Sequence, residues 1–233
     1  MALSSRFMPI VRGTLSRELI VRTAIELADD VGLDRLTMRS VAAALGGEAM
    51  SLYGHVENKA DLLEAMQDTL LAELLEATQQ RMVPGESWDD TVRALTRSYL
   101  TMADRHIGAW RLYLLPVFPS TQGIKLIDLI FTSLESTPLD RVDLGQVFAT
   151  LVSASFGAIA FELATSHALQ RDAQTARNAH SAAAADERER FNRRASDIMK
   201  IERNARFDAT IEAVISGLKV AHPCLDRSPA SQA

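Results

Sequence analysis

The sequence predicts an all-α protein with an N-terminal three-helix head and a longer helical body. Apolar residues recur at intervals of three and four, as they do on one face of a helix, and no stretch shows the apolar–polar alternation of a strand. Near the N-terminus, two short helical stretches are joined by Gly46-Gly47, which is the arrangement of a helix-turn-helix. These observations define the fold class and locate the head.

The head is expected to contain three helices. Ser16 is a suitable N-cap for the first, which Gly32 ends. Its apolar face consists of Ile20, Ala24, Leu27, Ala28 and Val31. Thr37 caps the second helix, and Gly46-Gly47 ends it because left-handed backbone costs glycine least. The third helix is expected at residues 48–55, with Leu52 buried and Gly54 inside it.

The body is expected to be helical throughout. Asn58 caps a long helix that ends before Pro84, and Glu86-Ser87-Trp88 opens the next. Pro116 and Pro119 interrupt the apolar stretch of residues 106–119. Further helices are expected at residues 121–135, 138–167 and 203–222. The last carries the apolar stripe Phe207, Ile211, Val214, Ile215 and Leu218, so it must pack on another helix. Residues 168–190 lack such a face and are expected to be a mobile connection or a frayed helix.

Composition excludes several classes of protein. Of 233 residues, 47% are hydrophobic, which excludes a disordered chain, and the apolar runs are shorter than the roughly 20 residues that cross a bilayer. The lone Cys224 excludes an internal disulfide and a thiolate zinc cluster. We expect no signal peptide, no membrane association and a cytoplasmic location.

The charge distribution permits binding to nucleic acid. The net charge of −5 opposes such binding for the whole molecule, but residues 1–22 carry four arginines against the single Glu18. Residues 1–14 are expected to be a mobile arm. Plain disorder is one interpretation of it, and contact of Arg6 or Arg12 with phosphate or the minor groove is the alternative.

The head resembles a known family. The segments Thr-x-Arg-x-Val-Ala (from Thr37), Leu-Gly (from Leu45) and Ser-Leu-Tyr-x-His-Val-x-Asn-Lys (from Ser51) resemble the DNA-binding head of the TetR (tetracycline-repressor) family of transcription regulators. The resemblance is strong from Ser16 to about Leu75. It implies a DNA-binding domain at residues 1–60 and a ligand-binding and dimerisation domain at residues 61–233.

The resemblance also implies partners and a mode of action. The partners would be double-stranded DNA with a palindromic operator, a small and largely apolar effector, and a second copy of the chain. The helix at residues 138–167 and the last helix would form a four-helix bundle in this homodimer. The expected function is that of a ligand-responsive repressor, and an activator would use the same parts.

Eight residues are predicted to bind DNA. They are Thr37, Arg39, Ala49, Met50, Ser51, Tyr53, His55 and Lys59. Ser51 can bind a base edge or a phosphate, Met50 or Ala49 can contact a thymine methyl group, and Arg39 can bind the backbone or a guanine. The resemblance assigns phosphate contacts to Tyr53 and His55. A buried Tyr in an ordinary helix pair is the alternative.

A set of aromatic and polar side chains could line an effector pocket in the body. The candidates are His106, Trp110, Tyr113, Phe118, Phe131, Phe148, Phe156 and Glu162. Plain core packing is the alternative for the aromatic residues, and a structural ion pair is the alternative for Glu162. In the tetracycline repressors proper, a histidine and neighbouring polar groups hold a metal-bound drug, whereas leucine and tyrosine stand where such groups would fall around residues 108–116, so the resemblance does not extend to a tetracycline–magnesium ligand.

The sequence also bears on two other functional classes. A helical ligand-binding or interaction protein without sequence-specific DNA binding is the alternative to a repressor. An enzyme is not expected, since the five histidines are scattered and no glycine-rich phosphate loop follows a strand. No cofactor and no metal site are expected.

Overall fold

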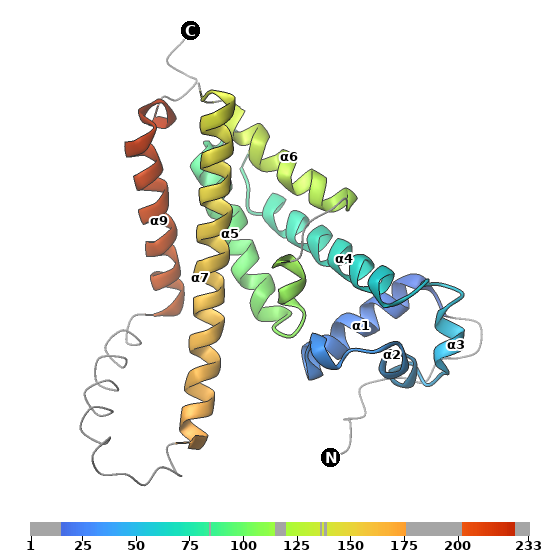
Figure 1. Ribbon diagram of the computed structural model, residues 1–233. Helices are drawn as coiled ribbons and strands as arrows, with labels where there is room; N and C mark the ends of the chain where they lie inside the picture. The colour runs from blue at the N-terminus through green and yellow to red at the C-terminus, as the bar shows by residue number, and fades with distance from the viewer. Residues whose placement is uncertain are drawn as a thin grey trace, which may run out of the picture. The chain divides into compact units, whose positions relative to one another are not determined.

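The computed structural model describes residues 15–83, 85–114, 120–135, 137, 139–175 and 202–226 (Figure 1). All regular elements among these residues are helical, which confirms the all-α prediction. The α-helices are α1 (Arg17–Val31), α2 (Met38–Ala44), α3 (Ala49–Leu52), α4 (Lys59–Gln79), α5 (Trp88–Arg105), α6 (Thr121–Glu135), α7 (Arg141–Thr175) and α9 (Arg203–Ala221). Three short 3-10 helices accompany them: η1 (Leu33–Arg35), η2 (Trp110–Leu114) and η3 (Pro223–Asp226).

The chain forms two compact units. The first comprises Met1–Glu86 and Arg97–Thr132, and the second comprises Ser87–Thr96 and Ser133–Ala233. The first unit contains the helix-turn-helix, and the second contains α7 and α9.

The first three helices and the start of α4 enclose a small apolar core. The Ser16 side chain accepts a hydrogen bond from the Leu19 N–H and caps α1, and Gly32 ends that helix with a φ of 85°. The residues that fill this core are Ile20, Ala24, Leu36, Val41, Leu52, Val56 and Leu62, and each is at most 1% exposed. The predicted N-cap and end of α1 are therefore confirmed, and so is its predicted apolar face except for Val31, which is half-buried.

The segment after α5 is fastened to both α1 and α4. The Gln67 side chain of α4 donates to the Leu112 carbonyl (2.9 Å), and the Tyr113 hydroxyl donates to the Leu70 carbonyl (3.1 Å). Gly108 lies against the last turn of α1, where a Cβ atom would stand 1.9 Å from the Ala28 carbonyl oxygen. Only glycine fits this close approach.

The second unit is built on an antiparallel pair of helices, α7 and α9, which lie side by side in Figure 1. Phe207, Ile211, Ile215 and Leu218 of α9 are buried, as their spacing predicts. Glu162, late in α7, pairs with Arg206 at the start of α9. Asp143, at the start of α7, lies 3.7 Å from His222 at the end of α9.

One part of α7, Arg141–Ala164, is long and apolar enough to cross a membrane by length and composition alone. The core helix of a soluble protein passes the same test. The apolar runs of the sequence looked too short for a span because single polar residues divide them, whereas the helix as a whole has a high mean hydropathy.

Some predicted boundaries were wrong. α3 ends at Leu52, so Gly54 lies in the following turn and not inside the helix. α7 begins at Arg141 because the Asp140 side chain accepts from the Val142 and Asp143 N–H groups and caps the helix there. The same helix continues to Thr175, through the first part of the predicted mobile connection. Several residues used in the predictions lie outside the described residues. They are the N-terminal arm with Arg6 and Arg12, Pro116, Phe118, Pro119, Pro138 and residues 176–190.

Candidate nucleic-acid interface

α2 begins with a reciprocal cap. The Thr37 hydroxyl accepts from the Ser40 N–H (3.0 Å), and the Ser40 hydroxyl accepts from the Thr37 N–H (2.9 Å). This pair satisfies two backbone donors that the helix itself leaves free. Met38 and Val41 point into the core while Arg39 is exposed between them. The cap therefore fixes the direction in which Arg39 leaves the helix.

Two glycines turn the chain from α2 to α3. Gly46, with a φ of 71°, donates to the Ala43 carbonyl (3.1 Å), and Gly47 donates to the Ala42 carbonyl (2.9 Å). These two bonds form a Schellman motif, in which the first residue past the helix takes left-handed backbone. The predicted role of Gly46-Gly47 is thus confirmed, and the left-handed residue is Gly46.

α3 consists of four residues, of which Met50 and Ser51 are exposed to solvent. Leu52 is fully buried, and Val56 just beyond the helix is 1% exposed. Met50 is 76% exposed, Ser51 is exposed, and Ala49 is half-buried. Because so short a helix is not stable by itself, Leu52 and Val56 supply its attachment to the head.

The turn after α3 carries further predicted DNA-binding residues. Tyr53 is 46% exposed, His55 is exposed, and Lys59 is exposed at the first position of α4. The N–H groups of His55 and Val56 donate to the Leu52 carbonyl (2.9 and 3.0 Å). Asn58 caps α4 by accepting from the N–H groups of Ala60 and Asp61.

The polar groups of this surface are partly engaged within the protein. The Ser51 hydroxyl donates to the Glu48 carbonyl (2.6 Å), so its oxygen remains an acceptor toward a base edge. The Thr37 hydroxyl serves the α2 cap. Arg39, His55 and Lys59 supply the cationic and titratable groups, which suit the phosphate backbone of DNA.

The guanidinium of Arg17 and the carboxylate of Asp61 form a bidentate ion pair beside this turn. Arg17 also donates to the His55 carbonyl (2.9 Å), and Asp61 accepts from the Glu57 N–H (2.8 Å). The hydrogen bond from Arg17, together with the Glu57 N–H, lowers the pKa of Asp61 to about 2. The pair is therefore fully ionised at neutral pH.

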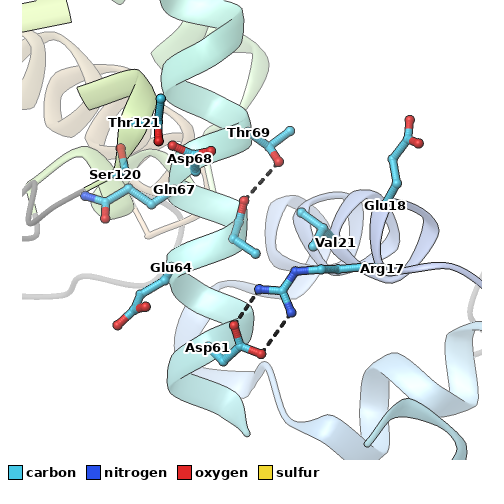
Figure 2. Close-up of a pocket in the computed structure, with 11 residues that line it drawn as sticks. Arg17, Glu18, Val21, Asp61, Glu64, Gln67, Asp68, Thr69, Ser120 and Thr121 are labelled. Carbon is cyan, nitrogen blue, oxygen red and sulfur yellow. Dashed lines mark hydrogen bonds and ion pairs between the residues drawn. The ribbon is translucent and has the colours of Figure 1, made fainter. Parts of the chain in front are cut away.

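The ion pair forms one wall of a surface cleft of about 600 Å³ (Figure 2). α1, α4 and the start of α6 line the cleft, and Figure 2 shows Arg17 and Asp61 pointing toward one another. Glu18, Glu64 and Asp68 add carboxylates, and the Gln122 N–H donates to Asp68 (3.2 Å). The cleft contains none of the predicted effector-pocket residues.

The predicted pocket residues of the first unit are His106, Trp110, Tyr113 and Phe131. His106 is bound to carboxylates: its Nδ1 lies 2.8 Å from Asp29, and its Nε2 lies 3.4 Å from Glu73. Burial lowers the pKa of His106, but the hydrogen bonds and charges of Asp29 and Glu73 outweigh it and leave the pKa raised. Tyr113 is buried and stacks edge-to-face on Tyr99, with the ring centroids 4.9 Å apart. Trp110 and Phe131 are half-buried.

The predicted pocket residues of the second unit are Phe148, Phe156 and Glu162. The two phenylalanines are half-buried. Glu162 is 2% exposed and forms a bidentate ion pair with Arg206. Of the two alternatives for Glu162, a pocket residue or a structural ion pair, the structure shows the ion pair.

Sequence reasoning missed three residues that organise the first unit: Arg17, Asp61 and Asp29. The Asp29 carboxylate binds His106 and accepts from the N–H groups of Gly108 and Ala109, both at 3.1 Å. Arg17 and Asp61 are 44 positions apart, and Asp29 and His106 are 77 apart. A charged residue on a helix gives no periodic signal for so distant a partner, so the pairs emerge only from the fold.

The chain matches known proteins most clearly in the helix-turn-helix. A profile of the family described as "Bacterial regulatory proteins, tetR family" matches residues 20–66. The chain is 39% identical over 87 residues to the tetracycline repressor protein class D of Escherichia coli, covering 36% of this chain and 38% of that protein. It is 35% identical over 93 residues to the HTH-type transcriptional repressor DrrR1 of Streptomyces coeruleorubidus, covering 40% and 33%. The chain thus aligns with less than half of the length of these relatives.

Solved structures show that the likeness in fold extends well beyond the head. A possible TetR family transcriptional regulator from Streptomyces coelicolor A3(2) superposes with a TM-score of 0.67 at 20% identity, covering 89% of this chain and all of that one. ActR from Streptomyces coelicolor in complex with actinorhodin has a TM-score of 0.65 at 23% identity, covering 90% and 97%. The helix-turn-helix of residues 20–66 thus matches the TetR family of bacterial regulatory proteins, and these structures show that the chain as a whole has the same fold as TetR family regulators.

Proposed function

We propose that the protein is a ligand-responsive transcriptional repressor that binds a palindromic operator as a homodimer. The observation that carries the proposal is the exposure of Arg39, Met50, Tyr53, His55 and Lys59 around a short helix anchored by buried residues. Such a surface offers apolar, polar and cationic contacts to the major groove and the adjacent phosphates. The relatives named as repressors support the same function.

α7 and α9 supply a surface suited to a second copy of the chain. Val142, Phe161 and Val220 are 67%, 51% and 81% exposed, although each is a large apolar side chain. Two copies of this helix pair would form a four-helix bundle and remove these side chains from water. A two-fold axis would then present two α3 helices to an operator with two-fold symmetry.

Release from DNA is proposed to follow from binding of a small effector in the body. ActR is known in complex with actinorhodin, and a TetR from Acinetobacter baumannii, in a variant form, with minocycline. An effector that binds the non-DNA-binding conformation more tightly shifts the population toward it. Within the first unit, Trp110 and Phe131 remain candidates for apolar contacts in such a site.

The proposal includes a division of labour and a location. Residues 1–60 bind DNA, residues 61–233 bind the effector and dimerise, and the protein acts in the cytoplasm without catalysing a reaction. The apolar length of α7 is interpreted as the core of the dimer bundle. In the part of the chain that the structure describes, no group of three His, Cys, Asp or Glu side chains is placed to hold a metal.

The test is a selection of bound fragments from sheared genomic DNA of the source organism. A repressor retains a few fragments, and footprinting then reveals two half-sites about 10 base pairs apart or slightly more. Retention must weaken steeply as salt increases, because phosphate contacts release counterions. Failure of every fragment to bind in a salt-dependent way would leave the rival function, a helical ligand-binding or interaction protein.

A further inference from the structure

The turn that joins α3 to α4 has little regular structure of its own. Between Leu52 and Lys59, the backbone bonds within the turn reach only from His55 and Val56 back to Leu52. Val56 is the one side chain of this turn that is buried. Yet the turn carries Tyr53 and His55, which are predicted to contact phosphate, and leads into Lys59, which is predicted to add a cation to the DNA-binding surface.

The Arg17–Asp61 ion pair supplies the missing restraint. One guanidinium nitrogen of Arg17 donates to the His55 carbonyl (2.9 Å) and to Asp61 (2.9 Å), and the other nitrogen completes the bidentate pair. The same carboxylate accepts from the Glu57 N–H (2.8 Å). Two helices, α1 and α4, thereby hold the backbone of residues 55–57 from both sides.

We propose that Arg17 and Asp61 are positioning residues for DNA contact, and that their ion pair fixes the backbone of residues 55–57 and so directs Tyr53, His55 and Lys59 toward the phosphates. The inference rests on the proposed DNA-binding function. Three of the five N–H donors of Arg17 are engaged with Asp61 and the His55 carbonyl, so in this proposal Arg17 acts through the turn.

The direction in which one substitution changes DNA affinity distinguishes this positioning role from a simple effect of charge. Asp61→Asn removes a negative charge near the proposed DNA surface, which by charge alone strengthens binding. Loss of the Arg17–Asp61 ion pair instead removes the restraint on the backbone of residues 55–57, so we expect operator affinity to fall about tenfold. The matched control is Glu64→Gln, which removes the same charge one turn further along α4, in the same cleft but without a bond to the turn.

The experiment measures fluorescence anisotropy of an operator duplex obtained from the genomic selection. Asp61→Asn and Arg17→Lys should each bind about tenfold more weakly, and the double variant no more weakly than either, since both changes break one unit. Arg17→Lys keeps the charge but loses the bidentate geometry. Binding by Asp61→Asn that is as tight as, or tighter than, that of Glu64→Gln overturns the proposal.

A second measurement needs no DNA. Hydrogen exchange of the free protein should be faster at the Glu57 amide in Asp61→Asn and Arg17→Lys, and unchanged in Glu64→Gln. If the exchange rate of the Glu57 amide is unchanged in both Asp61→Asn and Arg17→Lys, the proposal is overturned. If wild-type protein retains no genomic fragment, the DNA-binding function fails, while this exchange measurement still decides whether the pair fixes the turn.

Discussion

Among Gly→Ala substitutions in the first unit, Gly108→Ala should cause the largest loss of stability. The new Cβ would stand 1.9 Å from the Ala28 carbonyl oxygen and 2.7 Å from the Asp29 Cα, and both neighbours are backbone atoms of α1. Ordinary contact begins at 3.4 Å, so the two segments must separate by roughly 1 Å or more. That separation also stretches the hydrogen bonds from Gly108 and Ala109 to the Asp29 carboxylate.

The magnitude follows from these two losses. Overpacking against rigid neighbours costs about 1–3 kcal/mol, and each hydrogen bond to a charged group contributes about 1.5–3 kcal/mol. Because the segments can relax, the losses are only partly additive, and we expect a decrease of about 3–4 kcal/mol in the free energy of unfolding of this unit.

Urea unfolding followed by the fluorescence of Trp110, two residues away, measures this effect. A shared Trp88→Phe background removes the other tryptophan, which lies in the second unit. The control is Gly54→Ala, where the nearest atom stands 4.0 Å from the new Cβ, and it should change stability by about 1 kcal/mol or less. If Gly108→Ala unfolds at the same urea concentration as Gly54→Ala, the close approach to α1 does not exist in solution.

Three further predictions concern charges. The raised pKa of His106 means that its contribution to stability is complete below about pH 6.5, the pKa of a free histidine, and is lost as pH rises through the folded pKa. NMR titration of the ring should therefore give a pKa above 6.5 that falls in Asp29→Asn. Glu162→Gln breaks a buried pair and should cost about 3–5 kcal/mol in thermal unfolding, whereas Glu212→Gln, in an exposed pair, should cost about 1 kcal/mol or less. Lys59→Ala should reduce the slope of log affinity against log salt by about 1, and an unchanged slope would exclude a phosphate contact there.

The sequence predicted those features that depend on local chemistry. Ser16, Thr37 and Asn58 cap helices as predicted because a cap needs only a side-chain oxygen and the next three residues. Phe207, Ile211, Ile215 and Leu218 are buried because helical periodicity places them on one face, and Val214 of the predicted stripe is half-buried. The predicted start of α7 at residue 138 was wrong because the Asp140 side chain caps the helix, which begins at Arg141.

The candidate site shows the limit of such reasoning. The exposed residues of α3 follow from the position of Leu52 in the motif, but the role of His106 depends on a carboxylate on α1 and another on α4. From the sequence alone, a histidine in an apolar stretch is as compatible with a ligand pocket as with a structural ion pair. The pairing of Glu162 with Arg206 likewise depends on the antiparallel packing of α7 on α9, which no local pattern specifies.

The brevity of α3 has a consequence for changing what the protein recognises. Its attachment depends on Leu52 and Val56, whereas residues 49–51 and Tyr53 contribute little to the core. The predicted DNA contacts and the buried anchors thus occupy separate positions within one stretch of eight residues. A library randomised at residues 49–51 and 53 can be screened for new operator sequences without sacrificing the fold, which makes this head a suitable scaffold for engineered gene switches.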